Sequence, residues 1–277
     1  NEKQRQAVEY KKGALLIIAG AGTGKTAVIT QRIVHIINSK WAKPDEILAL
    51  TFTEKAADEM LQRVDESMPI GYGDVWISTF HSFCDRILKQ EGYNIGLDTD
   101  YILMSAAQSY VFLRKHLFDL SLKKFRPYGN PTKFVNDLLD HFSRLQDEDI
   151  SPSEYLEYAK SLSRKDSVEK EEYEDTLELA TVYDEYTKLK MKNSMLDFGD
   201  LILLTIKLFR EKPNVLKRYQ EKFKYILVDE FQDTNYSQSV LINILSGLDP
   251  KKDMDKVGKI NPNLTVVGDD DQAIYKF

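Results

Sequence analysis

Two short segments of this 277-residue sequence carry side chains that could do chemistry together. The first, residues 19–26, is a glycine-rich run that ends in Lys25 and Thr26, and the second is the acidic pair Asp229 and Glu230. Backbone N–H groups of such a loop surround an anion, while the lysine reaches the β- and γ-phosphates and the hydroxyl binds magnesium. The acidic pair can supply a carboxylate for the metal and a base for the attacking water. Together the segments predict hydrolysis of a nucleoside triphosphate.

Each residue of the glycine-rich loop is a predicted nucleotide contact. Lys25 is also a catalytic candidate, because it would reach the transferred phosphate, and Thr26 is a predicted magnesium ligand with Asp229. One position departs from the usual pattern, since Ala19 stands at its first glycine. The alternative is a glycine-rich turn with a solvated lysine. The predicted contacts are Ala19, Gly20, Ala21, Gly22, Thr23, Gly24, Lys25 and Thr26.

The elements around these segments predict an α/β fold. The short apolar run at 14–18 is typical of a buried parallel strand that enters the loop. After the loop, helical spacing gives an apolar face at Val28, Ile29, Ile33, Ile36 and Ile37, and leaves Thr30, Gln31, Arg32 and Asn38 polar. Further strands are predicted at 47–52, 75–79, 225–229 and 263–267. Strands alternating with helices indicate a parallel sheet, whose ligands collect beyond the carboxyl ends of the strands.

Two glutamines are candidates for sensing the nucleotide. Gln272 follows the last predicted strand, where its amide could bond to the γ-phosphate and shift when that phosphate leaves. Gln4 precedes the first strand, and its amide could read the adenine edge because it both donates and accepts hydrogen bonds. A polar face of an N-terminal helix is the commoner explanation for Gln4.

Residues at other strand ends are candidate contacts for a nucleic acid. Phe52 could stack on a base, and Thr51 and Thr79 could contact phosphates. The favoured alternative is that Phe52 belongs to the core and that Thr53 caps the next helix. His81 is at least as well explained by a structural role. Tyr275 and Phe277 offer aromatic faces, with core packing as their default.

The α/β pattern stops between residues 93 and 194, where helical signals take over. Helices are predicted at 106–118, 132–145, 151–162 and 168–191, and residues 151–154 read as a capping box with proline at the first helical position. We therefore expect an α/β domain made of 1–92 and 195–277, interrupted by a helical subdomain at 93–194.

Composition limits the classes of protein. The formal charge of −6 argues against a wholly basic nucleic-acid binder, although it allows a local basic groove. One cysteine, Cys84, and the lack of a signal peptide or a long apolar run favour a soluble cytoplasmic protein with no membrane partner. The four histidines and this cysteine make no zinc spacing. Because the sequence lacks an initial methionine, we expect it to be part of a longer chain.

The motifs, taken together and in order, resemble those of the UvrD/Rep-type superfamily 1 DNA helicases. Ala27 departs from that pattern, since many members have arginine there, and Phe277 stands where tryptophan is frequent. The matching segments cover the whole length: Asn1–Gln4 with Ala7 and Val8, residues 19–26, Thr51–Thr53 with Ala56, Ala57 and Met60, Thr79–Ser82, Asp197–Leu201, Asp229–Asp233, and Gly268–Gln272 with Ile274 and Tyr275.

The resemblance implies a RecA-like P-loop NTPase sheet that uses ATP and Mg²⁺, with an inserted all-helical subdomain. By similarity, Gln4 recognises adenine, Glu230 is the base and Gln272 couples the nucleotide state to DNA. Similarity also implies single-stranded DNA and duplex junctions as partners, with movement from 3′ to 5′. The residues placed near the strand are Phe52, His81, Tyr275 and Phe277.

The family also has a second RecA-like domain that would lie beyond Phe277. Its arginine fingers are missing from these residues, and such a finger can supply about 10³ to 10⁵ in rate, so the fragment should hydrolyse ATP poorly. Two other functions stay open. One is a nucleotide-dependent subunit that binds DNA or a nuclease complex without unwinding; the other is a small-molecule kinase, which explains only the first 40 or so residues.

Overall fold

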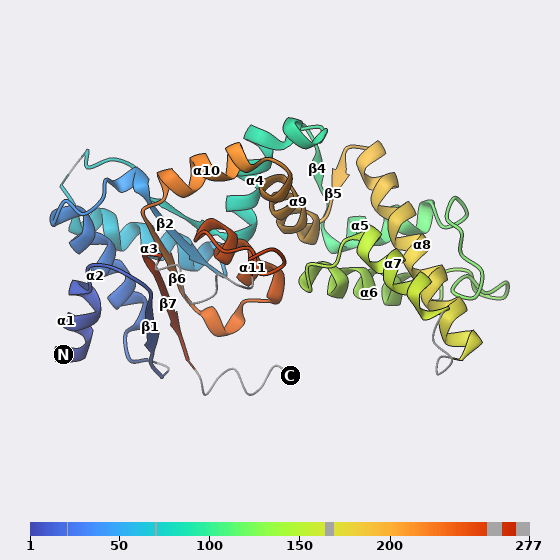
Figure 1. Ribbon diagram of the computed structural model, residues 1–277, viewed down its shortest axis with the longest axis horizontal. Coiled ribbons are helices and arrows are strands. Elements are labelled where there is room, and N and C mark those ends of the chain that lie inside the picture. The colour runs from blue at the N-terminus through green and yellow to red at the C-terminus, as the bar shows by residue number, and fades with distance from the viewer. Residues whose placement is uncertain (21, 70, 164–168, 254–261, 270–277) are drawn as a thin grey trace. The chain divides into compact units, whose positions relative to one another are not determined.

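The computed structural model describes residues 1–277 except 21, 70, 164–168, 254–261 and 270–277. The chain forms two compact units, residues 1–86 with 208–277 and residues 87–207 (Figure 1). Two helices, α4 (Phe80–Glu91) and α9 (Phe198–Glu211), contain the points where the chain leaves and re-enters the first unit. None of the helices in the described ranges has both the length and the apolar character needed to span a bilayer.

The first unit is built on a five-stranded parallel sheet with the order β1-β7-β6-β2-β3. In the register, Ile18 lies beside Gly268, and Leu50 lies beside Val228. Because all five strands run the same way, their carboxyl ends meet at one edge, which confirms the predicted α/β class. The strands are β1 (Leu15–Ile18), β2 (Ile47–Thr51), β3 (Trp76–Thr79), β6 (Tyr225–Val228) and β7 (Leu264–Gly268).

Helices cover both faces of this sheet (Figure 1). On one face, Ile29 and Ile33 of α2 and Met60 of α3 pack with Ala49 and Leu227 of the strands. Alternate strand residues point to the other side, where Figure 1 shows α10 and α11. The helices are α1 (Glu2–Glu9), α2 (Lys25–Asn38), α3 (Glu54–Ser67), α10 (Pro213–Lys222) and α11 (Tyr236–Leu245), with 3₁₀ turns η1 (Pro44–Glu46) and η3 (Phe231–Asp233).

Strand β1 is less buried than its apolar sequence predicts. It lies at the edge of the sheet, and among the described strands it pairs with β7 alone. Ile17 packs into the core, whereas Leu16 and Ile18 are 62% and 59% exposed. The expectation of a buried strand was therefore wrong for one of its two faces, because an apolar run does not reveal which strand lies at the edge.

The second unit is mainly helical and has its own apolar core, with α7 packed along α8. The capping box at Ser151 is confirmed, since its side chain accepts a hydrogen bond from Glu154 N and Glu154 bonds back to Ser151 N. The unit is not wholly helical, because β4 (Ile102–Leu103) pairs in parallel with β5 (Met195–Leu196). Its helices are η2 (Gly92–Ile95), α5 (Ala106–Lys115), α6 (Val135–Asp147), α7 (Pro152–Leu162) and α8 (Lys170–Lys192).

Candidate nucleotide-binding site

The glycine-rich loop connects the carboxyl end of β1 to the first turn of α2. The start of the loop is bonded to β7, the neighbouring strand of the sheet, because Ala19 N donates to Gly268 O at 3.0 Å. Gly22 and Gly24 have φ of 72° and 88°, a left-handed conformation that side chains with a Cβ rarely adopt. The backbone therefore turns sharply into the helix, as a phosphate-binding loop requires.

Lys25 projects from the first turn of α2 into a cluster of acids. Lys25 is 8% exposed, and its Nζ lies 3.3 Å from Asp269 Oδ2 and 3.7 Å from Glu230 Oε2. These acids follow the ends of β7 and β6, so the sheet brings together groups that are more than 200 positions apart in the sequence. The ammonium is held at the carboxyl edge of the sheet.

Thr26 and Asp229 lie side by side at the same edge. Thr26 Oγ1 donates to Asp229 Oδ2 at 3.0 Å, and Asp229 is 2% exposed. Burial raises the pKa of Asp229 above its ordinary value; the hydrogen bond from Thr26 opposes this shift, and the charge of Glu230 adds to it. The hydroxyl and the carboxylate thus present two hard oxygen donors close to Lys25.

The chemistry of these two donors fits magnesium. Mg²⁺ keeps several waters and takes one or two carboxylates together with the phosphates of the substrate. Within the described residues, no group of three or more His, Cys, Asp or Glu side chains could hold a metal ion by itself. A metal that arrives with a nucleotide therefore suits Thr26 and Asp229 better than a metal held by protein alone.

Glu230 has a backbone conformation that few residues other than glycine adopt. Its φ is 50°, and its N–H donates to Asp229 Oδ1 at 3.0 Å. The side chain is 35% exposed, in contrast with the buried Asp229. Glu230 is therefore the acid of the pair that water can reach.

Gln4 lies against the loop, as a contact to a bound nucleotide would require. Its Nε2 donates to Thr23 O at 3.1 Å, and its Oε1 accepts from the Asn1 amino group at 2.8 Å. The residue also completes the capping box of α1, so the helix-face explanation is satisfied as well. Both interpretations of Gln4 are compatible with its position.

The candidate nucleic-acid contacts at the strand ends differ in accessibility. Phe52 is 43% exposed, so the favoured assignment of its ring to the core was wrong, whereas Thr53 does cap α3 through Ala56 N. Thr51 is fully buried and Thr79 is 4% exposed, with its hydroxyl bonded to Glu54 at 2.8 Å. Both side chains are buried in this structure, and the contacts to a nucleic acid stay predictions for these two threonines.

His81 is half-buried at the start of α4. Burial lowers the pKa of His81, and the Glu54 carboxylate opposes this shift only in part, which favours the neutral ring. Four residues with predicted roles lie outside the described residues: Ala21, Gln272, Tyr275 and Phe277.

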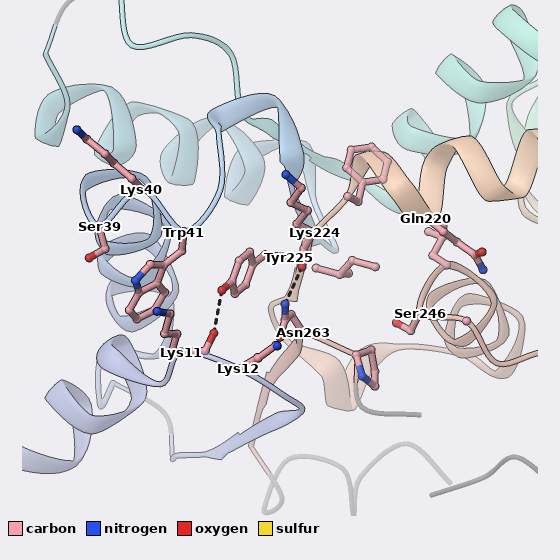
Figure 2. Close-up of a pocket in the computed structure, with 15 residues that line it drawn as sticks. Lys11, Lys12, Ser39, Lys40, Trp41, Gln220, Lys224, Tyr225, Ser246 and Asn263 are labelled. Carbon is pink, nitrogen blue, oxygen red and sulfur yellow. Dashed lines mark hydrogen bonds between the residues drawn. The ribbon is translucent and has the colours of Figure 1, made fainter. Parts of the chain in front are cut away.

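A separate cavity of about 790 Å³ opens at the amino ends of β6 and β7 (Figure 2). Tyr225 donates from its hydroxyl to Lys11 O, and Asn263 Nδ2 donates to Lys224 O, at the two bonds that Figure 2 marks. Its lining residues do not include the glycine-rich loop or the acidic pair. Since ligands of parallel sheets bind at the carboxyl ends, this cavity is not part of the nucleotide site.

The sequence matches the family described as UvrD/REP helicase N-terminal domain over residues 1–277. The chain belongs to this family. The membership agrees with the parallel sheet and with the position of the glycine-rich loop at its carboxyl edge.

Relatives in the UvrD/REP family are considerably longer than this chain. ATP-dependent DNA helicase PcrA of Bacillus subtilis is 39% identical over 279 residues, which cover all of this chain and 33% of the relative. PcrA of Leuconostoc citreum is 36% identical over 276 residues, and PcrA of Staphylococcus aureus is 37% identical over 277 residues. The chain spans about a third of the length of these curated relatives.

Two residues of this family member were missed by sequence reasoning. Arg32 was expected on the polar face of its helix but is 1% exposed; its Nη1 donates to Ala7 O at 2.9 Å, and its Nε donates to Thr265 Oγ1 at 3.1 Å. Burial lowers the pKa of Arg32. Asp269, the buried partner of Lys25, lies in an acidic run in which the sequence predicted a role for Gln272 alone. Arg32 of α2 thus links α1, the helix that contains Gln4, to β7. No local sequence pattern indicated these contacts.

Proposed function

We propose that this chain is the N-terminal ATP-binding part of an ATP-dependent DNA helicase or translocase. In the complete protein, hydrolysis of magnesium-bound ATP would drive movement along single-stranded DNA, in the 3′ to 5′ direction, and separation of duplexes at junctions. The observation that carries the proposal is the convergence of Lys25, Thr26, Asp229 and Glu230 at one edge of the sheet. The PcrA relatives, named as ATP-dependent DNA helicases, support the same function.

Each group of the site has a proposed task. The glycine-rich loop cradles the phosphates, and Lys25 turns from its acidic partners to the β- and γ-phosphates. Thr26 and Asp229 hold Mg²⁺, which when bound neutralises charge on the phosphates. Glu230, the acid that water can reach, takes the proton from the attacking water. Gln4 contacts adenine, and Gln272 reports loss of the γ-phosphate.

The two units have separate proposed roles. Residues 1–92 with 195–277 form the RecA-like ATP-binding core, and residues 93–194 form the inserted helical subdomain. A second RecA-like domain of the longer protein completes the nucleotide site with arginine. DNA binds through Phe52 and His81 of the described residues, and through Tyr275 and Phe277.

The test uses the full-length protein and compares ATP binding, ATP hydrolysis and strand separation with and without single-stranded DNA. We expect Lys25→Ala to lose nucleotide binding, because its ammonium is the main counter-charge to the phosphates. Glu230→Gln should keep binding and lose about 10²-fold or more in hydrolysis, since it removes the base. Lys217→Ala is the matched control, because that lysine lies on an exposed face of α10 with an ion pair to Glu221.

Unwinding by either site variant at the wild-type rate would contradict the proposed mechanism. Hydrolysis that DNA stimulates, without strand separation, would favour a translocase or a binding subunit. Hydrolysis that depends instead on a small acceptor molecule would favour a kinase.

A further inference from the structure

The side chain of Gln232 joins two parts of the candidate site. It lies in η3, just after the acidic pair, and is half-buried. Its Nε2 donates to Glu230 Oε2 at 2.6 Å, and its Oε1 accepts from Asp269 N at 3.0 Å. The amide therefore bridges the acid at the end of β6 and the backbone at the end of β7.

The two partners determine the orientation of this amide. A backbone N–H can only donate, and a carboxylate can only accept, so the oxygen of Gln232 must face Asp269 and its nitrogen must face Glu230. Gly268 leaves room for this arrangement, because a Cβ at that position would lie 3.1 Å from Gln232 Oε1. The position of the Gln232 amide is thus determined by residues at the ends of both β6 and β7.

The bridge engages one particular oxygen of the Glu230 carboxylate. Oε2 accepts from Gln232 and is the oxygen that lies 3.7 Å from Lys25 Nζ. The backbone of Glu230 is left-handed, a conformation that costs energy and persists only where neighbouring groups hold it. Among the described residues, Gln232 and Lys25 contact Oε2, and these contacts limit how the carboxylate can turn.

We propose that Gln232 is a positioning residue for hydrolysis: its amide holds the Glu230 carboxylate and couples it to the end of β7, which carries the acid that binds Lys25. The inference rests on the proposed function. Displacement of a base by about 1 Å can cost on the order of 10²-fold in rate, so this bond should matter for turnover rather than for nucleotide affinity.

Two isosteric variants of the full-length protein separate the two bonds. Gln232→Glu keeps an acceptor for Asp269 N but sets a carboxylate against Glu230, whereas Gln232→Met removes both bonds. We expect each to lower kcat for DNA-stimulated ATP hydrolysis by about 10- to 100-fold and to change KM for ATP by less than about threefold. Gln62→Glu is the matched control, because Gln62 donates to Glu66 at 2.8 Å on an exposed helix and its variant should keep wild-type kcat.

A second measurement tests whether Gln232 acts through Glu230. In a Glu230→Gln background the base is already gone, so adding Gln232→Met should lower the residual rate by less than about twofold. Wild-type kcat in Gln232→Glu would overturn the proposal, and so would a rise in KM that matches the loss in kcat. A further loss of tenfold in the Glu230→Gln background would also overturn it.

The proposed function fails in a different way. It fails if the wild-type protein shows no DNA-stimulated hydrolysis, or if Glu230→Gln hydrolyses ATP normally. Retained nucleotide affinity shows that a Gln232 variant is folded. If Gln232→Met does not fold, the comparison of Gln232→Glu with wild type still decides the question.

Discussion

Each unit of the molecule contains a buried lysine that faces two carboxylates, but the two clusters differ in how tightly they are closed. Lys190 of the second unit is wholly buried, lies 2.5 Å from Asp200 Oδ2 and also contacts Asp197. The Lys25 side chain is 7% exposed, yet its two carboxylates lie 3.3 and 3.7 Å away. The same residue types therefore form one saturated cluster and one loose cluster.

Further hydrogen bonds complete the Lys190 cluster. Gln146 Nε2 donates to Asp197 at 3.0 Å and to Asp200 at 2.9 Å, and the backbone N–H of each aspartate donates to the carboxylate of the other. Burial lowers the pKa of Lys190, but the charges of Asp200 and Asp197 outweigh burial and raise it. Lys190 contacts both carboxylates, and burial together with the charge of Asp197 raises the pKa of Asp200 to about 6. Ion pairs and hydrogen bonds engage every group of the cluster, which is typical of a structural role.

The Lys25 cluster is open in comparison. The Glu230 side chain is 35% exposed, and the glycine-rich loop leaves open space, since a Cβ at Gly20 would meet no atom within 4 Å. Under the proposed function, a triphosphate replaces the acids as the partner of Lys25. The two clusters thus differ in how accessible their charged groups are and in how many hydrogen bonds complete them. This difference is what we expect between a candidate binding site and a structural cluster.

Removal of each lysine is the strongest test of this contrast. We expect Lys190→Met to lower the free energy of unfolding of the second unit by about 3–5 kcal/mol, because two buried carboxylates lose their counter-charge. Lys25→Met should cost the first unit about 1 kcal/mol, because its contacts are longer and one acid reaches water. Hydrogen exchange followed by mass spectrometry measures the stability of each unit separately. Lys188→Met is the control, because Lys188 is an exposed lysine of the second unit. Equal losses would remove the distinction.

Two glycines give a second, smaller contrast. A Cβ at Gly199 would lie 2.2 Å from Gln146 Oε1, so Gly199→Ala must displace the amide that bonds Asp197 and Asp200. We expect a loss of about 1–3 kcal/mol in urea unfolding, as for other overpacked sites. Gly20→Ala should change stability by less than about 0.5 kcal/mol. Similar stabilities for the two variants would show that Gln146 moves without cost.

The smallest expected effect is a pH dependence in the second unit. His141 lies 3.0 Å from Tyr155 Oη, and burial, with a further contribution from Arg144, lowers the pKa of His141 from its ordinary value of 6.5. Below that value the unfolded chain binds more protons than the folded one, so stability falls as the pH drops through 6.5.

The variant His141→Gln isolates this effect. It should reduce the loss in thermal midpoint between pH 7.5 and pH 5 by on the order of 2 °C relative to wild type. The comparison of the two proteins at each pH cancels contributions from other groups. An unchanged difference between the two pH values would show that His141 does not titrate with unfolding.

Several features of the fold could be predicted because they depend on neighbours in the sequence. Apolar runs of four to six residues identified the strands, and helical spacing identified α2. Helical signals and the capping box at 151–154 identified helices of the second unit. The glycine-rich loop and the acidic pair identified the candidate nucleotide site through chemistry that requires those residue types. The cap at Thr53 followed from its position before a helix.

Other features depended on contacts between distant positions and were missed. The burial of Arg32 depends on acceptors from α1 and β7, and the pairing of β4 with β5 joins segments more than 90 residues apart. The exposure of Phe52 was misjudged because a ring at a strand end packs only if another element covers it.

The sequence by itself determined the chemical groups of the candidate site and the strands that carry them, because both follow from local residue types and periodicity. Only the tertiary structure decided which acids Lys25 meets, since Asp269 is 244 positions away and reaches it through the strand order β1-β7-β6. The same holds for Lys190, whose cluster became structural because Gln146 and two backbone N–H groups complete it. The sequence determines which charged residues are present, whereas tertiary packing determines whether those residues are enclosed and paired or stay accessible to a ligand.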